Sequence, residues 1–174
     1  VKAPPKKERE PHDVRKWTAL AENCYLSPDA KATRAQVAAD LGVSVESLER
    51  LGVGCGFDEY RKLSYSTWPE RRQGGRVMGI IRRYRVPVKE GNNKLMMEGG
   101  RHGLYLPRDW WQGSGPILIP EGGSDTAALT TLGISAIGRP SNVAGVNHLI
   151  GVLAECEQLA RPLIVIGERD QKPD

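Results

Sequence analysis

The sequence predicts an α/β protein in which a helical N-terminal segment and a small basic antiparallel β subdomain precede a Rossmann-like parallel sheet of βαβαβ order. Two observations lead to this prediction. Residues 76–86 alternate in the manner of a strand and are rich in β-forming and basic side chains. The C-terminal third alternates short apolar strands with longer segments of helical periodicity. Strands that alternate with helices along a chain form parallel sheets with right-handed crossovers.

Composition divides the 174 residues into four parts. The Pro-rich, charged residues 1–12 are expected to form a disordered arm. A helical segment is expected at 13–60, the basic β subdomain at 61–112 and the parallel unit at 113–174, with its C-terminal end truncated. No apolar run approaches the roughly 18–20 residues of a membrane helix, so no membrane partner is expected. The three cysteines lack zinc-ligand spacing, and a reduced, cytoplasmic protein is expected.

Helix-start and helix-stop residues define three expected helices in the helical segment. The apolar positions of Asp13–Cys24 fall on one helical face. Thr33 opens a capping-box pattern, which predicts a helix from Thr33 to Gly42. Ser44 is expected to cap a further helix that Gly52 ends.

The last two helices allow two interpretations. Their spacing and small residues fit a helix-turn-helix that binds DNA, or a structural helical hairpin. The helix that would enter the groove carries Glu46 and Glu49 against Arg50. Acidic side chains oppose binding to phosphates, so the structural hairpin is favoured.

The middle of the chain is strongly basic. Residues 61–108 contain 12 Lys and Arg against 3 Asp and Glu, whereas the whole chain carries a net charge of only +4. Strands are expected at 76–86, Lys94–Met97 and Leu104–Leu106, with glycine-containing turns between them. Such a sheet can bind phosphate, although a solvated strand face explains the charge equally well.

Two expected strands of the C-terminal third end in acidic residues. We expect strands at Ile117–Pro120, Ile134–Ile137 and Leu163–Gly167, with helices at Ser124–Leu132 and 146–160 between them. The expected core face of the second helix consists of Val146, Leu149, Ile150, Leu153, Cys156 and Ala160.

Glu121 directly follows the first of these strands, and Glu168 and Asp170 follow the third. The carboxyl ends of parallel strands meet at one edge of a sheet, so these three carboxylates are expected to converge. Carboxylates packed closely repel unless a cation lies between them, and oxygen ligands favour Mg²⁺ or Mn²⁺. Asp125 lies in the first turn of the next helix, where it either takes part in the site or stabilises the helix end.

Several segments, in order, resemble the TOPRIM domain of bacterial and phage primases. Residues 117–125 resemble its first motif, a strand followed by E-G-x-x-D, and residues 163–170 resemble its second, a strand followed by D-x-D, with Glu168 in place of the first Asp. Residues 68–79 and 100–106 are similar to the primase segments that precede the TOPRIM unit. The resemblance covers roughly residues 60 to 174.

The resemblance implies a DnaG-type primase or primase-helicase core, which makes RNA primers from ribonucleotides on a single-stranded DNA template. Glu121 and Asp125 would be catalytic, and Glu121 would bind the metal ion together with Glu168 and Asp170. A replicative helicase is an implied partner. A TOPRIM nuclease or topoisomerase-related enzyme, and a non-catalytic DNA-binding protein with a degenerate site, remain alternatives. The implied ligands of nucleotide or template phosphates are Arg82, Arg83, Lys94 and Arg101.

Overall fold

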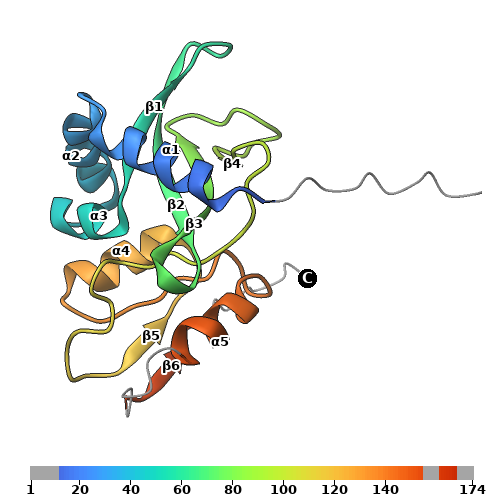
Figure 1. The fold of residues 1–174 in the computed structure, drawn as a ribbon. Coiled ribbons are helices and arrows are strands. Elements are labelled where there is room, and N and C mark those ends of the chain that lie inside the picture. The colour runs from blue at the N-terminus through green and yellow to red at the C-terminus, as the bar shows by residue number, and fades with distance from the viewer. Residues whose placement is uncertain (1–11, 155–160, 168–174) are drawn as a thin grey trace, which may run out of the picture.

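The computed structural model describes residues 12–154 and 161–167, which form two sheets with helices packed against them (Figure 1). Within these residues, no helix has the length and apolar character needed to span a membrane. The larger sheet is antiparallel, has the order β1-β2-β3-β4, and consists of β1 (Gly54–Asp58), β2 (Leu63–Arg71), β3 (Val77–Tyr84) and β4 (Lys94–Met96). The smaller sheet is parallel and consists of β5 (Ile117–Ile119) and β6 (Leu163–Val165).

The three N-terminal helices are α1 (Val14–Leu26), α2 (Ala30–Leu41) and α3 (Val45–Leu51). Their capping residues confirm most of the predicted ends. Asp13 accepts hydrogen bonds from two backbone N–H groups of the first turn of α1, and Ser44 accepts one from the Ser47 N–H in α3. Gly42 and Gly52 end α2 and α3 in left-handed backbone conformations.

The predicted start of α2 at Thr33 was wrong. The helix begins at Ala30, and the backbone N–H of Thr33 donates to the carbonyl of Asp29 at 2.9 Å as part of the first turn. The capping-box pattern therefore lies inside the helix, because Asp29 already occupies the N-cap position.

Strand β1 lies within the segment predicted to be helical, and this is a second correction. A side-chain carbon at Gly54 would meet the backbone of Cys24 in α1 at 2.5 Å, and one at Gly56 would meet the Tyr65 ring at 2.6 Å. These glycines allow close approach of a helix and a ring to the strand. This close packing determines that the segment forms strand β1. The β propensities of its residues do not predict it.

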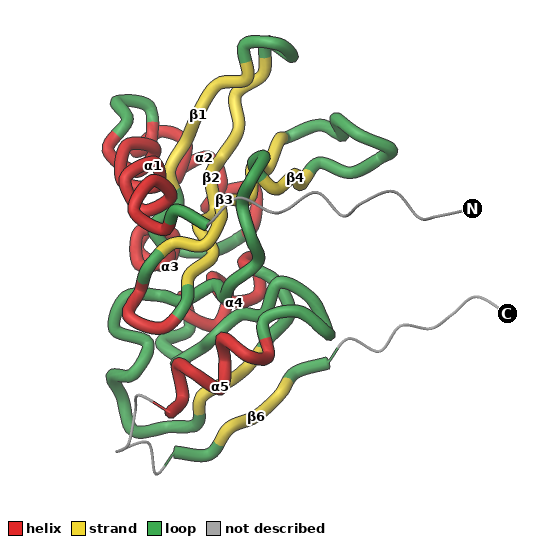
Figure 2. The backbone as a smooth tube through the Cα atoms, turned by 45° about the vertical axis from the view of Figure 1, so that its right-hand side comes forward, coloured by secondary structure: helices red, strands yellow, loops and turns green. Residues whose placement is uncertain are grey.

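The larger sheet is covered by helices on both faces. On one face, Trp17 and Ala21 of α1 pack with Val77 and Ile80. On the other face, residues of α2, α3 and α4 (Gly123–Thr131) pack with Trp68 of β2. Figure 1 shows α1 in front of this sheet, and Figures 1 and 2 both show α4 between the two sheets. Successive residues of β2 and β3 therefore point either toward α1 or toward α4.

Two segments that were predicted as strands form only isolated β-bridges. The segment predicted as a strand at 134–137 lies parallel to β5: the Leu118 N–H donates to Ser135 and the Ile137 N–H donates to Leu118. In the segment 104–106, Leu104 pairs with Arg71 of β2, and Tyr105 pairs with Gly138 in the parallel part. These short pairings connect the larger sheet to the parallel one.

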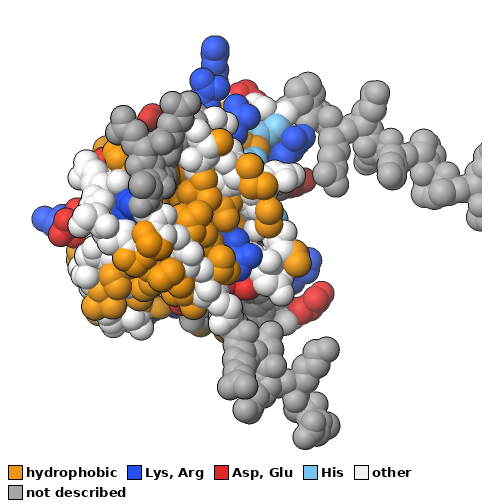
Figure 3. Space-filling model, turned by 90° about the horizontal axis from the view of Figure 1, so that it is seen from below, with side chains coloured by type: hydrophobic (Ala, Val, Ile, Leu, Met, Phe, Trp, Pro, Cys, Tyr) orange, Lys and Arg blue, Asp and Glu red, His pale blue; other side chains and the backbone are white. Residues whose placement is uncertain are grey.

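The apolar face predicted for the last helix was partly wrong. Helix α5 (Val146–Ala154) buries Val152 and part of Leu149 and Leu153 against the core, but Val146 is 44% exposed and Ile150 is 61% exposed. Positions 156 and 160 of that face lie outside the described residues. The residues of β6 are also exposed. Figure 3 shows hydrophobic side chains gathered on the face of the molecule seen from below. The remaining helical turn, η1, covers Gln73–Gly75.

Acid is expected to destabilise the fold through Asp58. Its carboxylate accepts hydrogen bonds from the Arg61 backbone N–H at 2.9 Å and from the Tyr84 hydroxyl at 2.7 Å. These bonds, that from Arg61 first, lower the pKa of Asp58 from 3.8 to about 2. Because the folded-state pKa is depressed, the stabilisation is present above pH 4 and is lost as the pH falls toward 2.

Urea unfolding between pH 6 and pH 2 measures this effect. We expect the free energy of unfolding of Asp58→Asn to fall less steeply below pH 4 than that of the unsubstituted protein. Equal slopes for the two proteins would show that Asp58 does not contribute to acid sensitivity.

Candidate active site

Glu121 is placed by the end of β5. The backbone N–H of Gly122 donates to the Arg139 carbonyl at 2.7 Å, and Glu121 itself pairs with Arg139 in a parallel bridge. Gly122 then turns the chain with φ of 91°, which favours glycine, and serves as the N-cap of α4. The half-buried Glu121 therefore lies where a fixed strand end meets the start of a helix.

Asp125 lies in the first turn of α4 and is exposed. It is not the N-cap residue, since Gly122 takes that position without a side-chain cap bond. An acidic side chain there interacts favourably with the positive end of the helix dipole. This position is compatible with a structural role and with a role beside Glu121, and the catalytic role stays a prediction.

Glu168 and Asp170 lie outside the described residues, but the strand that leads to them is described. Strands β5 and β6 run parallel with Ile119 opposite Val165, and the Ile166 N–H donates to the Ile119 carbonyl at 3.1 Å. The carboxyl end of β6 therefore lies at the same edge of the sheet as Glu121. No group of three or more potential metal ligands occurs within residues 12–154 and 161–167. The three-carboxylate cluster stays a prediction.

The loop that carries Glu121 packs against the basic sheet. A side-chain carbon at Gly123 would lie 2.8 Å from the Trp68 ring, so the loop contacts this ring closely. The guanidinium of Arg83 lies 5.9 Å from the centroid of the same ring. Lys94 is directly opposite Arg83 in the β3–β4 register, and both side chains thus point to the α4 side of the sheet. Arg83 and Lys94 are therefore on the face of the sheet against which the Glu121 loop packs.

Arg82 points to the other face of the sheet. Its Nη1 lies 3.7 Å from Oδ2 of Asp58, and its guanidinium lies 5.7 Å and 6.0 Å from the ring centroids of Tyr65 and Tyr84. This environment indicates a structural ion pair on the α1 side. Arg101 is exposed in the loop after β4, and its N–H donates to the Met78 carbonyl at 3.0 Å. The phosphate-binding roles of all four basic residues stay predictions, and the geometry favours Arg83 and Lys94 over Arg82.

Glu70 is a buried acidic residue that no motif in the sequence singles out. It lies in β2, is fully buried, and points to the same face as Trp68. Its Oε2 accepts the Gly103 N–H at 2.8 Å and lies 3.0 Å from Nδ1 of His102. Burial, followed by the charge of Glu70, raises the pKa of Tyr105. Strand alternation from the apolar Trp68 was the signal that placed Glu70 on a buried face.

The two helices of the helix-turn-helix interpretation are packed into the protein. Helix α3 contacts α4, and the Ser44 N–H donates to the Thr131 hydroxyl at 2.9 Å. Arg34 of α2 is buried and donates to the Val53 carbonyl at 2.9 Å. These contacts favour the structural hairpin.

Comparisons with known proteins identify the fold. No protein-family model matches the chain, and no curated protein matches it. Solved structures do match. The DnaG catalytic core is 19% identical with a TM-score of 0.60, over 91% of this chain and 61% of that one. The E. coli primase catalytic core is 18% identical with a TM-score of 0.59, over 90% and 63%.

A DnaG primase catalytic domain bound to ssDNA is 18% identical with a TM-score of 0.55, over 87% of this chain and 60% of that one. The chain thus spans about 60% of the length of these structures. At identities this low the likeness concerns the fold alone. The chain has the fold of DnaG-type primase catalytic cores.

Proposed function

We propose that this chain is the core of a primase-like nucleotidyltransferase that synthesises RNA primers on a single-stranded DNA template during bacterial or phage replication. The observation that carries the proposal is the packing of the Glu121 loop against the face of the basic sheet that presents Arg83 and Lys94. This packing supports the proposal because the Glu121 loop and Arg83 both contact the Trp68 ring. The shared fold with DnaG catalytic cores, one of them bound to ssDNA, supports the same function.

We further propose that β5, α4 and β6 form a TOPRIM-like unit whose carboxylates hold Mg²⁺ or Mn²⁺. The ligands would be Glu121, Glu168 and Asp170. Their oxygen donors suit a hard divalent ion, and the parallel register of β5 and β6 brings both strand ends to one edge. The ion, when bound, would stabilise negative charge that develops on phosphate.

Different side chains of this chain would then accept the proton and bind the phosphates. Glu121 is the proposed acceptor for the proton of the attacking 3′-hydroxyl, which requires a carboxylate within hydrogen-bond reach of that group. Arg83 and Lys94 would hold the phosphates of the template or the incoming ribonucleotide, because guanidinium and ammonium groups donate strong hydrogen bonds to them. A replicative helicase is a proposed partner, since the primase fragment of the phage T7 primase-helicase protein has the same fold.

Ribonucleotide incorporation tests this function directly. The full-length protein is incubated with a single-stranded DNA template, labelled ribonucleotides and Mg²⁺ or Mn²⁺. We expect labelled RNA whose sequence follows the template and whose formation stops when the ion is chelated. Shortening of the DNA without incorporation would instead indicate a TOPRIM nuclease. Template binding that neither cuts DNA nor incorporates ribonucleotides would indicate a non-catalytic DNA-binding protein.

A further inference from the structure

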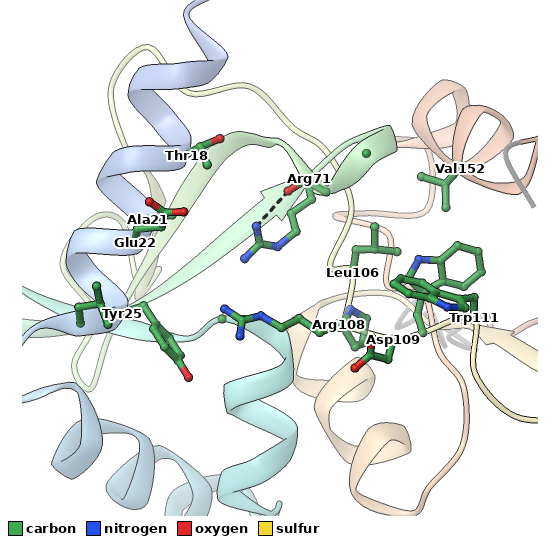
Figure 4. Close-up of a pocket in the computed structure, with 16 residues that line it drawn as sticks. Thr18, Ala21, Glu22, Tyr25, Arg71, Leu106, Arg108, Asp109, Trp111 and Val152 are labelled. Carbon is green, nitrogen blue, oxygen red and sulfur yellow. Dashed lines mark hydrogen bonds between the residues drawn. The ribbon is translucent and has the colours of Figure 1, made fainter.

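A pocket of about 710 Å³ lies on the α1 side of the larger sheet (Figure 4). It is lined by α1, by Gly52, by the end of β2 with η1, and by the segment 106–111, and Val152 of α5 contributes to its wall. This volume falls within the roughly 300–1,000 Å³ of small-molecule sites. The pocket can therefore accommodate a ligand the size of a nucleotide.

The pocket is separate from the candidate active site. Neither α4 nor the Glu121 loop contributes a lining residue to it. Its basic residue from β2 is Arg71, which lines the pocket beside α1, whereas the neighbouring Glu70 points to the opposite face with Trp68. The pocket and the Glu121 loop therefore have no lining residue in common.

Two guanidinium groups face this pocket. Figure 4 shows the side chains of Arg71 and Arg108 directed into the space between α1 and the segment 106–111. The Nη1 of Arg71 donates to the Gly75 carbonyl at 3.1 Å. Within the part of the chain that the structure describes, neither group forms an ion pair, although Glu22 and Asp109 also line the pocket.

The two positive charges repel each other. Burial, followed by the charge of Arg108, lowers the pKa of Arg71, and the negative charge of Glu22 offsets only part of this effect. A bound anion would relieve this repulsion and would accept hydrogen bonds from both groups. Phosphate suits this role because guanidinium groups bind it through paired N–H donors.

The remaining wall of the pocket is aromatic and apolar. Arg108 lies over the Tyr25 ring, 5.4 Å from its centroid, so that ring is already covered by a cation. Trp111 is 53% exposed and lies edge-on to the buried Trp110 at the other side of the arginines (Figure 4). Leu106 lies between the arginines and Trp111. A ligand with a phosphate at one end and a flat ring at the other would fit here. Its phosphate would meet the two arginines, and its ring would stack on the exposed Trp111, since bases stack on exposed aromatic rings.

We propose that this pocket binds a free mononucleotide, with its phosphates between Arg71 and Arg108 and its base against Trp111. This would be a second nucleotide site, which takes no lining residue from α4 or from the Glu121 loop. It does not depend on catalysis at Glu121, and binding of a nucleotide here would not require a divalent ion.

Calorimetric titration of the full-length protein with ATP in excess EDTA tests the proposal. We expect saturable binding that Arg108→Gln weakens about tenfold or more, because hydrogen bonds to a charged group are lost. Arg71→Gln should weaken it similarly, and Trp111→Ala should weaken it less. Arg76→Gln, which removes an exposed arginine outside the pocket, is the charge-matched control and should leave the affinity unchanged.

Further titrations distinguish a nucleotide site from a site for inorganic phosphate or nucleic acid. They also distinguish the pocket from the candidate active site. Glu121→Gln should leave ATP binding in EDTA unchanged even if it abolishes incorporation. Unfolding curves identify any loss that is due to misfolding, and Arg108→Gln alters an exposed side chain that the core does not require. The proposal is overturned if ATP does not bind in EDTA, if Arg76→Gln weakens binding as much as Arg108→Gln, or if inorganic phosphate binds as tightly as ATP. Binding of a single-stranded oligonucleotide that is tighter than ATP binding in the unsubstituted protein and is lost in Arg108→Gln would assign the pocket to nucleic acid instead.

Discussion

Replacement of Glu121 by Gln is expected to lower the rate of template-directed ribonucleotide incorporation by about 100-fold or more. The amide keeps the shape of the side chain but has no negative charge, so it neither accepts the hydroxyl proton nor ligates a divalent ion well. The backbone around it is held by the pairing with Arg139, and the fold should stay intact. Initial rates of incorporation, with unfolding curves for both proteins, measure the effect.

Glu46→Gln is the matched control for this substitution. It makes the same change of charge on an exposed residue in the first turn of α3, away from β5. We expect its rate to equal that of the unsubstituted protein. An equal loss in both variants, or full activity in Glu121→Gln, would remove Glu121 from the reaction.

The second large effect is expected at Gly123, where the Glu121 loop meets the basic sheet. An added methyl group would lie 2.8 Å from the Trp68 ring and 3.1 Å from the Tyr105 ring. Both rings are buried and have little room to move. Gly123→Ala should therefore lower the free energy of unfolding by about 1–3 kcal/mol. It should also lower incorporation by about tenfold or more, because a small misplacement of reacting groups is costly.

Gly115→Ala serves as the control, since a methyl group there meets no atom within 4 Å. Urea unfolding and incorporation rates are compared for the two variants. Gly115→Ala should behave like the unsubstituted protein in both assays. If Gly123→Ala is as stable and as active as this control, the contact with Trp68 does not fix the loop.

Local signals in the sequence predicted the elements whose ends depend on a few nearby residues. Ser44 and Gly52 set the ends of α3 through a side-chain cap and a left-handed glycine, and both effects act within one turn. The run of strong β-forming residues predicted β3, and its first five residues are all buried because helices cover both faces of the strand. The order of β5, α4, α5 and β6 followed from apolar runs of strand and helix length.

Elements that depend on distant contacts were missed. Strand β1 exists because Gly54 allows α1 to approach its backbone, and no local pattern reports that approach. Thr33 resembled a helix cap, although Asp29 had already begun the helix. In the candidate site, Glu121 could be placed from its strand, whereas the opposite orientations of Arg82 and Arg83 emerge only when the strand register is known.

Anomalous diffraction from crystals of the full-length protein soaked in Mn²⁺ tests the central claim most directly. We predict one or more manganese peaks at the carboxyl end of the parallel sheet, with the carboxylate oxygens of Glu121 and of the acidic residues after β6 at about 2.0–2.3 Å from the ion. Strong peaks elsewhere with none near Glu121, or a Glu121 carboxylate directed away from the chain that follows β6, would contradict the proposed metal site and the function built on it.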